Sequence, residues 1–594
     1  MTNADLRPRP LGDRAFLLEW QASDVTTGTI AAFARHIARL SLPWLQELVP
    51  AYRTIAVYIR SSDVTVEQAS EELLRALRDF APSADRNDRK LVELPVSYGG
   101  DDGPDLEEAA ARCGMSAERF AAMHSEPVYE VAMIGFAPGF PYLSGLPEEL
   151  AQPRHRTPRL NVPAGAVGIA GGQTGVYPVD SPGGWQIIGR TPARLFRPEA
   201  EQPFLLAPGD RVKFVPASGG ETRMAEEAVN AAAGKPNRRS GRTMPAALIV
   251  LKPGMHTTVQ DAGRPGWQAY GVSVGGAMDR YALRTANILV GNDEDAAGLE
   301  FTLIGGSFIA EQDLLVALCG ADFEASADGE AIPMNKPVAV RGGTTIALGR
   351  AASGCRAYMA VAGGIDVPTV LGSRSADTRA RIGGGSGDGS PLVAGERLAC
   401  GHPSALSLVI GDSLHRRLRL EGRRWATVTW HTSGNGSEQR ADRSATVRLR
   451  VLPGAEWDQF DVEANNRLFG SAYRVDASSD RMGIRLGGAP VERRSASELA
   501  SHGVSPGTVQ IPPDGQPIVL AAGCQPTGGY PKAAHVIAAD WPLLAQLAPG
   551  RRVRFEMVEE KDALLARRER ERDISLLKAG VFARVCALTT GGTT

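Results

Sequence analysis

Residues 206–214 read LAPGDRVKF, and residues 547–555 read LAPGRRVRF. Each copy predicts a turn followed by a strand whose side chains alternate between the two faces. Two further pairs of segments match in the same order along the chain: VPAGAVGI (162–169) with VSPGTVQI (504–511), and QTGVYP (173–178) with QPTGGYP (525–531). Three ordered matches predict two copies of one β-rich module. We therefore expect Gly165 and Gly507 in equivalent turns, and Tyr177 and Tyr530 at equivalent positions.

Length and composition place this module in a large globular protein. The chain has 594 residues, which is too long for one core and predicts several domains. Its 67 glycines and 40 prolines, with only 6% aromatic residues, favour turn-rich β structure. The formal net charge of −2 gives no general attraction for nucleic acid or anionic membranes.

The rest of the chain divides around the repeats. Residues 1–90 mix strand-like runs (16–20 and 54–59) with helical spacing (29–40 and 66–80), which predicts an α+β module. A polar, small-residue-rich segment predicts a linker between two halves, and a charged C-terminal segment predicts an exposed helix. The expected divisions are 1–90, 91–216, the linker 217–245, 246–558 and the helix or tail 559–594. A second polar stretch, 433–445, is expected to be a loop.

Generic sequence motifs give little support for a nucleophile, a phosphate-binding loop, a metal site or a biotin carrier on this chain. GVSVG (271–275) fits a nucleophile elbow around Ser273, but a loop-like segment precedes it where a buried strand is required. The Gly234-Lys235 pair is followed by proline, so it is no phosphate-binding loop. No histidine pair has metal-ligand spacing, so no metal site is expected. No Met-Lys-Met occurs, so we expect no biotin on this chain, and a mobile loop is the favoured interpretation of GGGSGDGS (383–390).

The first 20 residues show no basic region followed by an apolar one, and no apolar run approaches the roughly 20 residues of a membrane helix. We therefore expect a cytoplasmic protein without nucleic-acid or membrane partners.

A dense Gly/Pro-rich stretch, residues 134–193, is the strongest candidate for a binding site. It suits an anionic or amide ligand, because arginine binds carboxylate or phosphate through two parallel hydrogen bonds and amide or hydroxyl groups bind lactam or urea edges. Ordinary turns with solvated arginines are the equally weighted alternative. The polar residues of the stretch are Arg154, His155, Arg156, Arg159, Gln173, Thr174, Tyr177, Ser181 and Gln186.

The same stretch carries a specific family resemblance. GFAPGFPYLSGLP, TPRLNVPAGAVGIAGGQTGVYP and SPGGWQIIGRTP resemble the signature blocks of the allophanate hydrolase subunit 1 (KipI-like) family, over about residues 8–216. VQDAGRPGWQAYGVSVGGAMDRYALRTANILVGN and GTVQIPPDGQPIVLAAGCQPTGGYPKAAHVI resemble the subunit 2 (KipA-like) family, over about residues 247–558. The chain thus resembles the two subunits fused head to tail.

The resemblance implies a mostly β protein made of cyclophilin-like β barrels. One barrel would follow the α+β N-terminal module, at 91–216, and two related lobes would form 246–558. It also implies a component of ATP-dependent 5-oxoprolinase, using ATP with Mg²⁺ and acting with a LamB/YcsF-type subunit; a homo-oligomer is left open. Family members usually have Asp-Arg where this chain has Gly523-Cys524, which puts its activity or its substrate in question.

Residue roles follow from residue type and motif position. We assign binding of carboxylate or phosphate to Arg154 and Arg159, and binding of the amide to Gln173 and Gln186. Tyr177 and Thr174 would position the substrate, and Ser181 would contact it. The second half adds further candidates: Asp261 and Lys532 for catalysis, and Arg264, Asp279 and Tyr530 for substrate binding.

Three functions remain open. The first is opening of 5-oxo-L-proline to L-glutamate with ATP. The second is carboxyl transfer from a biotin carrier in trans to urea or a related amide. The third is a KipI-like regulator of a histidine kinase. We expect the Gly/Pro-rich loops of the first module to face a groove shared with the second half, with Trp185 and Trp267 near it. A core position for both tryptophans is the equally weighted alternative.

Overall fold

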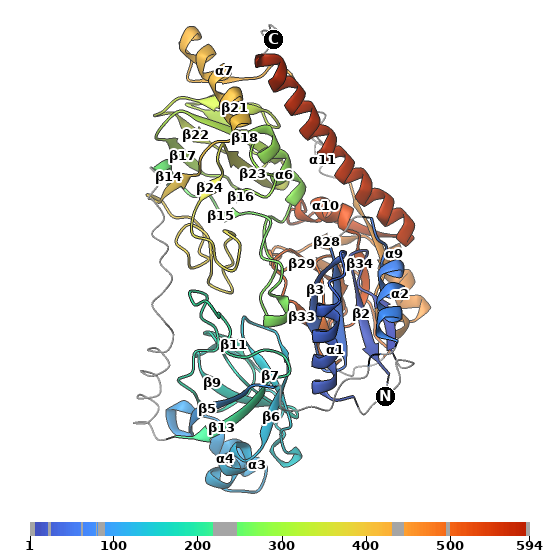
Figure 1. Ribbon diagram of the computed structural model, residues 1–594. Coiled ribbons are helices and arrows are strands. Elements are labelled where there is room, and N and C mark those ends of the chain that lie inside the picture. The colour runs from blue at the N-terminus through green and yellow to red at the C-terminus, as the bar shows by residue number, and fades with distance from the viewer. Residues whose placement is uncertain are drawn as a thin grey trace.

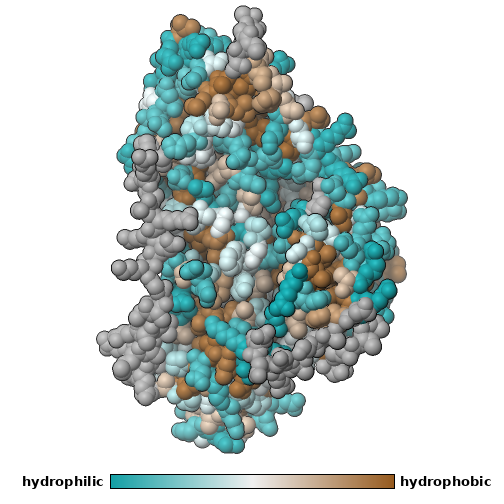
Figure 2. Space-filling view, in the orientation of Figure 1, coloured by the Kyte–Doolittle hydropathy of each residue, from teal (hydrophilic) through white to brown (hydrophobic). Residues whose placement is uncertain are grey.

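The computed structural model describes residues 6–21, 25–60, 63–78, 80, 89–217, 246–430, 445–494 and 499–589. The expected linker, apart from residue 217, and nearly all of the expected loop at 433–445 lie outside these ranges. Apolar and polar residues are interspersed over the face shown in Figure 2.

The N-terminal module is a four-stranded antiparallel sheet with two helices, as the sequence predicts. The apolar side chains of Ile30, Phe33 and Ile37 recur at helical spacing and are buried against the sheet. The second helix begins with a capping box between Thr65 and Gln68. In sheet order the strands are β1 (Leu6–Pro10), β2 (Ala15–Trp20), β4 (Thr54–Ile59) and β3 (Leu45–Pro50), and the helices are α1 (Thr27–Arg39) and α2 (Val66–Leu77).

Barrel 1, residues 89–217, is a closed barrel of seven strands with a two-stranded ribbon and helices α3 (Leu106–Arg112) and α4 (Ala117–Ser125) outside it. The ribbon consists of β8 (Arg159–Val162) and β11 (Ser181–Gly183). Around the barrel the strands are β5 (Leu91–Tyr98), β12 (Gln186–Arg190), β9 (Ala166–Ala170), β10 (Gln173–Val176), β7 (Pro141–Ser144), β6 (Val128–Ile134) and β13 (Arg211–Pro216).

Residues 246–430 form a lobe of two sheets that enclose the largest core cluster. The lobe was expected to be a cyclophilin-like barrel, but the structure has a seven-stranded and a six-stranded sheet here. One sheet is β20 (Glu330–Ala331), β19 (Ser326–Ala327), β22 (Thr345–Ala347), β17 (Ser307–Ala310), β14 (Ala246–Lys252), β25 (Arg397–Cys400) and β24 (Ile365–Asp366). The other is β15 (Thr257–Gln260), β16 (Gly298–Thr302), β23 (Ser353–Val361), β18 (Leu314–Asp322), β21 (Pro337–Val340) and β26 (Trp425–Thr427). The helices are α6 (Arg280–Leu289) and α7 (Ala405–Glu421).

Barrel 2, residues 445–557, is a second closed barrel of seven strands. Its ribbon is β30 (His502–Gly503) with β33 (Thr527–Gly528), and its helices are α9 (Val462–Gly470) and α10 (Trp541–Ala545). Around the barrel the strands are β27 (Val447–Pro453), β34 (Lys532–Val536), β31 (Thr508–Gln510), β32 (Ile518–Leu520), β29 (Gly483–Gly487), β28 (Tyr473–Val475) and β35 (Arg552–Met557).

The predicted duplication is confirmed strand by strand. In barrel 1, strand β13 pairs in parallel with β5 and antiparallel with β6. In barrel 2, the equivalent strand β35 pairs in parallel with β27 and antiparallel with β28. Gly165 and Gly507 occupy equivalent turns with φ of 85° and 87°. The two LAPG glycines, Gly209 and Gly550, have φ of 90° and 84°. Both matching segment pairs therefore fold in the same way.

The third segment pair was aligned wrongly. QTGVYP lies on β10, whose equivalent is β32, whereas QPTGGYP leads into β34, whose equivalent is β12. The strand registers make Trp185 the counterpart of Tyr530 and Ile187 the counterpart of Lys532. Tyr177 is buried and Tyr530 is 45% exposed, so the predicted equivalence of the two tyrosines is wrong.

The N-terminal module packs on barrel 2, far along the chain from its own position (Figure 1). The Tyr58 hydroxyl donates to the Val504 carbonyl oxygen at 2.7 Å, and the Ser505 hydroxyl donates to the Leu11 carbonyl oxygen at 3.3 Å. Ala455 of barrel 2 belongs to the apolar cluster on this face of the N-terminal sheet. The two halves therefore form one body, because part of the first half covers the barrel of the second.

The charged C-terminal segment forms a single helix, α11 (Glu560–Thr589). It runs along the second half of the chain in Figure 1 and contacts α6 and α7. Ala563, Ile574 and Val581 of α11 are buried, so one face of the helix is packed and only the other is the expected solvated surface. Among the described residues, none of the helices has the length and apolar character needed to cross a membrane.

Candidate active site

The arginines predicted to bind substrate are divided between an ion-pair cluster and the barrel mouth. Arg159 binds both oxygens of Asp105, with distances of 2.6 and 2.9 Å, and lies 2.8 Å from the His155 ring. The Ile187 backbone N–H also donates to Asp105. Burial acts to raise the pKa of Asp105, but these hydrogen bonds outweigh it and hold the pKa below its ordinary value. Arg154 is exposed and lies apart from this cluster.

Barrel 2 has an equivalent cluster around Glu456. The Lys532 backbone N–H donates to Glu456 at 2.9 Å, as Ile187 does to Asp105, and His502 lies 3.0 Å from the carboxylate. The Lys532 ammonium is fully buried, 2.7 Å from the His502 ring and 3.9 Å from Glu456. Burial lowers the pKa of Lys532 to about 8. Because the N-terminal module covers this face, Lys532 is a structural ion here rather than an accessible catalytic group.

Other predicted residues of barrel 1 are in its interior. Thr174 is fully buried, and its hydroxyl donates to the Gly168 carbonyl and lies 2.9 Å from His124. Gln186 is also buried, and its amide donates to the Pro153 carbonyl oxygen. These contacts give Thr174 and Gln186 structural roles in place of the predicted substrate contact. Gln173 and Ser181 lie half-buried on β10 and β11.

Asp261 and Arg264 organise a loop of the second half. The Asp261 carboxylate accepts hydrogen bonds from the Ser373 and Ser375 hydroxyls at 2.6 and 2.5 Å and from the Arg374 backbone N–H at 2.6 Å. Arg264 is buried and donates to the Ser375 carbonyl oxygen. Both predicted residues therefore hold the loop in place, although Asp261 also borders a cavity.

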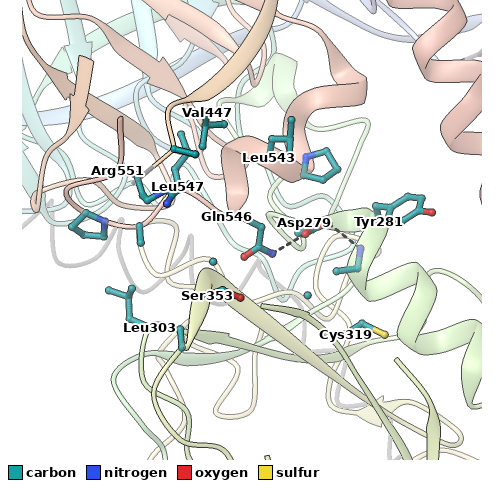
Figure 3. A pocket seen from close by; sticks show the side chains of 18 of the residues that line it. Asp279, Tyr281, Leu303, Cys319, Ser353, Val447, Leu543, Gln546, Leu547 and Arg551 are labelled. Atoms are coloured by element: carbon teal, nitrogen blue, oxygen red, sulfur yellow. Dashed lines mark hydrogen bonds between the residues drawn. The ribbon is translucent and has the colours of Figure 1, made fainter. Parts of the chain in front are cut away.

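Asp279 is the N-cap of α6 and is likewise structural. One carboxylate oxygen accepts the Ala282 backbone N–H, and the other accepts the Gln546 side-chain amide at 2.8 Å. Figure 3 shows Asp279 and Gln546 pointing toward each other across a pocket between the two-sheet lobe and barrel 2. Tyr530 lies at the surface of barrel 2, away from this pocket.

A group of residues that we call the junction site draws on the N-terminal module, both barrels and the two-sheet lobe. The guanidinium of Arg379 lies 5.0 Å from the centre of the Phe136 ring and 3.5 Å from the Gln525 amide oxygen. Burial raises the pKa of Tyr142 to about 12, while the charges of Arg154 and Arg379 act in the opposite direction. The junction site consists of Tyr52, Phe136, Tyr142, Arg154, Arg379 and Gln525.

Two local features mark the junction site as a place for a ligand. Phe136 has a φ of 64°, in the left-handed region that residues with side chains rarely adopt, and such strain is concentrated at binding and active sites. The buried hydroxyl of Tyr52 has no hydrogen-bond partner within the described residues, although Tyr142 and Arg154 are close enough to affect its pKa. A ligand with a polar edge would satisfy this hydroxyl.

Aromatic rings line the barrel 1 side of the junction site. The rings of Phe140 and Tyr177 are 5.0 Å apart, and Trp185 lies 5.3 Å from Phe140 and 5.7 Å from Tyr142. Burial raises the pKa of Tyr177 to about 12. Of the residues predicted from sequence, Arg154 belongs to the junction site and Tyr177 packs behind it. The arrangement suits a small ring with a negatively charged group.

The junction site adjoins Gly523-Cys524, the dipeptide for which the resemblance implies Asp-Arg in other family members. Gln525 directly follows Gly523-Cys524, and the Ser273 hydroxyl donates to the Gly523 carbonyl oxygen at 3.3 Å. Ser273 lies in a coil segment, so the strand required for a nucleophile elbow is missing. Cys524 is buried, and burial raises the pKa of its thiol to about 12, which leaves it protonated near neutral pH.

The expected groove between barrel 1 and the second half exists, and the Gly/Pro-rich loops of barrel 1 line part of it, but the two tryptophans do not. A cavity of about 680 Å³ is bordered by Pro178 and Arg190 of barrel 1 and by Arg381 of the lobe. Trp185 is in the barrel core, and Trp267 packs on Phe204 and Tyr270, so neither was placed correctly at this groove. Within the described ranges, no group of three or more His, Cys, Asp or Glu residues is arranged to hold a metal ion.

Sequence reasoning missed five residues of the junction site: Tyr52, Phe136, Tyr142, Arg379 and Gln525. Arg379 lies outside the family motifs, whereas Tyr52 lies in ELVPAYRTIAVYI, which also resembles the subunit 1 family. Only tertiary contact brings the two residues to barrel 1. Tyr142 lies inside the motif GFAPGFPYLSGLP, so it could have been selected from the family signature.

The fold and the site define a carboxyltransferase-domain protein with all four subdomains on one chain. Residues 6–206 match the family model of the carboxyltransferase domain, subdomains C and D, and residues 270–557 match subdomains A and B. The crystal structure of TTHA0988 superposes with a TM-score of 0.74 and 34% identity, covering 91% of this chain and 99% of that one.

Curated relatives identify the family more closely. The C-type subunit of 5-oxoprolinase from Escherichia coli is 40% identical over 325 residues, which is 55% of this chain and 96% of the relative. The B-type subunit of 5-oxoprolinase from Bacillus subtilis is 41% identical over 217 residues, or 34% of this chain and 90% of the relative. Urea amidolyase of Saccharomyces cerevisiae is 30% identical over 323 residues, 52% of this chain but 16% of the relative. The chain belongs to the family of B-type and C-type 5-oxoprolinase subunits and joins both on one polypeptide, which confirms the resemblance seen in the sequence.

Proposed function

We propose that this chain combines the B-type and C-type components of an ATP-dependent 5-oxoprolinase and opens 5-oxo-L-proline to L-glutamate. The observation that carries the proposal is the tandem match to the two kinds of subunit over nearly their full lengths. The packing of the N-terminal module on barrel 2 supports it, because the two parts form one body.

The chemistry requires activation of a poor electrophile. A lactam carbonyl resists attack by water, and transfer of the γ-phosphoryl group of ATP to its oxygen creates a good leaving group. Water then adds to the carbon, and the C–N bond breaks with protonation of the leaving nitrogen, which gives γ-glutamyl phosphate. A second water hydrolyses this acyl phosphate to glutamate and phosphate. The reaction therefore needs cationic groups beside the phosphate oxygens and hydrogen-bond donors at the lactam carbonyl oxygen. Mg²⁺ would accompany the phosphates, since it is usually held by phosphates and one or two carboxylates.

The junction site has the groups for the lactam. Arg154 and Arg379 would bind the carboxylate, the aromatic wall would contact the ring, and the Tyr52 hydroxyl or the Gln525 amide would bind the lactam edge. Arg159 is retained as a positioning residue, since it holds Asp105 beside the same barrel mouth. Arg159→Ala should lower kcat/KM without unfolding the chain; unchanged kcat/KM with native melting would leave it no role.

The LamB/YcsF-type partner is proposed to dock on the ribbon of barrel 1. In barrel 2 the equivalent ribbon is covered by the N-terminal module, and Gly503 approaches Ala56 so closely that a Cβ atom on Gly503 would lie 2.3 Å from that of Ala56. On barrel 1 the corresponding position falls at Leu160–Asn161, and Leu160 is 92% exposed. A large exposed apolar side chain at the counterpart of a packed interface supports a docking face.

This docking face has a direct test. Leu160→Glu should weaken binding of the LamB/YcsF-type subunit about 10-fold or more in a titration, with unchanged melting. Leu420→Glu is the matched control, because Leu420 is 82% exposed on α7 and lies in the two-sheet lobe. Equal binding by both variants would place the partner elsewhere.

Carboxyl transfer is the second candidate function. The family models are those of a carboxyltransferase domain, and urea amidolyase is among the relatives. It predicts loss of carboxyl groups from a carboxybiotin carrier on addition of urea or a related amide. The two functions separate in one assay: ATP- and partner-dependent glutamate from 5-oxoproline supports the first, and amide-dependent decarboxylation of carboxybiotin without glutamate supports the second.

A further inference from the structure

A cavity of about 890 Å³ lies where the N-terminal module, the two-sheet lobe, barrel 2 and α11 meet. Six arginines from these separate parts of the chain line it, together with four carboxylates. Its volume is in the range of sites that hold small molecules and cofactors. The arginines are Arg14, Arg60, Arg280, Arg284, Arg567 and Arg570.

The charges around the cavity are not balanced pair by pair. Arg284 is neutralised by Glu294 at 2.6 Å and Glu571 at 2.8 Å. Asp261, which borders the cavity, accepts hydrogen bonds from serine hydroxyls and backbone N–H groups. Within the described residues it forms no ion pair, although its charge acts to raise the pKa of Arg280. Arg280 has a carboxylate only at 3.9 Å, from exposed Asp295.

Two further arginines use their donors on groups other than carboxylates. Arg14 donates to the carbonyl oxygens of Ile59 and Arg60 at 3.2 and 3.3 Å. The guanidinium of Arg570 lies over the Tyr281 ring at 5.2 Å. Within the described part of the chain, neither Arg14 nor Arg570 forms an ion pair with a carboxylate. Positive charge is therefore concentrated around the cavity.

The positive charges of neighbouring arginines also lower one another's pKa. Burial lowers the pKa of Arg14 to about 10, and the charges of Arg567 and Arg280 act in the same direction. Burial likewise lowers the pKa of Arg280, with a contribution from Arg284. Like charges held together in a partly desolvated space repel, and an anion between them would relieve the repulsion.

We propose that this arginine-lined cavity binds the polyphosphate chain of a nucleotide, with Arg14, Arg280 and Arg570 as its main contacts. Arginine matches phosphate oxygens through two parallel hydrogen bonds. A single carboxylate needs one such arginine, whereas a di- or triphosphate carries enough negative charge for several. The choice of ATP as the nucleotide rests on the proposed function. The cavity would then be the ATP-binding site of this chain.

The position of the cavity fits phosphoryl transfer to a ligand at the junction site. Val274 and Ala522 line the cavity, and their chain neighbours Ser273 and Gly523 are hydrogen-bonded beside Gln525 of the junction site. The same two segments therefore border both places. A nucleotide in the cavity would place its terminal phosphate beside these two segments, which also border the junction site.

The test is ATP and pyrophosphate binding by the full chain, measured by calorimetry alone and with the LamB/YcsF-type subunit. Arg280→Gln and Arg570→Gln should each weaken both ligands about 10-fold or more and reduce the rise in melting temperature that the ligands cause. Neither variant should lower the melting temperature of the free chain, since each removes a positive charge that has no close carboxylate. Arg416→Gln on α7 is the control, because that arginine is exposed and outside the cavity.

Several results would overturn the assignment. Absence of ATP and pyrophosphate binding by the wild-type chain, alone and with the LamB/YcsF-type subunit, would do so, as would wild-type affinity in both variants. Arginine-dependent binding of 5-oxoproline or glutamate with no binding of pyrophosphate would assign the cavity to a carboxylate instead. Glutamate production with unaltered ATP affinity in the variants would leave the proposed function standing and remove this site. Loss of ATP affinity in the variants, with no glutamate production by the wild type, would support this site and remove the proposed function.

Discussion

Glu456→Gln should strongly destabilise barrel 2. The substitution removes the negative charge beside the Lys532 ammonium, which is fully buried and 3.9 Å from the carboxylate. It also weakens the contacts of Glu456 with His502 and with the Lys532 backbone N–H. Leaving a buried charge without its partner typically costs about 3–5 kcal/mol, so we expect a loss of that size.

The pKa of Glu456 gives an independent magnitude. Its contacts with His502 and Lys532 outweigh burial and hold the pKa at about 2, against an ordinary value of 4.5. At about 1.4 kcal/mol per pKa unit, a shift of about 2.5 units corresponds to roughly 3 kcal/mol. Because the folded-state pKa is depressed, this stabilisation is present above pH 4.5 and is lost as the pH falls toward 2. The variant should lack this acid dependence.

Hydrogen exchange is the suitable assay, because it reports local stability in a chain of several domains. It is measured on β34 and β31 amides for Glu456→Gln and on the equivalent β12 and β9 amides for Asp105→Asn. Asp105→Asn is the internal control: Asp105 has the same place in barrel 1, but its partner Arg159 is one-third exposed, so a loss of about 1–2 kcal/mol is expected. Glu456→Gln with Lys532→Met should recover most of the loss. A loss below about 1 kcal/mol, or a larger one for Asp105→Asn, would refute this reasoning.

Three further variants test other parts of the structure. Gly507→Ala should cost about 1–3 kcal/mol in melting experiments, because φ is 87° and the new Cβ would lie 2.6 Å from the Val536 carbonyl oxygen; a neutral result would contradict the shared turn. Asp279→Ala should cost about 1–2 kcal/mol by removing the α6 cap and the Gln546 bond, and native melting would argue against that role. Arg379→Gln should raise KM for the lactam about 10-fold without changing the melting temperature; unchanged KM would remove Arg379 from the junction site.

Local sequence signals predicted the secondary structure and the duplication well. The LAPG turns and the turns of Gly165 and Gly507 demand positive φ, which glycine adopts readily, so their repetition carried structural information. The segments QTGVYP and QPTGGYP failed because they match only in turn-forming residues. Turn chemistry is shared by unrelated loops, and only strand pairing showed that Tyr530 corresponds to Trp185.

The candidate site was harder to predict because its residues meet only through domain packing. Residue type alone could not show that Lys532 is sealed under the N-terminal module, or that Asp261 is occupied by two serines. Conversely, Arg14 and Arg570 lie near opposite ends of the chain, and they line one cavity only when the chain folds. Arg154 is the one residue of the junction site that was also selected from the sequence, and its role in binding substrate stays a prediction.

The most direct test of the central claim is glutamate release from 5-oxo-L-proline by the purified chain with a LamB/YcsF-type subunit and ATP. The account predicts glutamate formation that requires all three components, with one ATP hydrolysed for each lactam opened. No glutamate under these conditions, with amide-dependent decarboxylation of carboxybiotin in its place, would contradict the account.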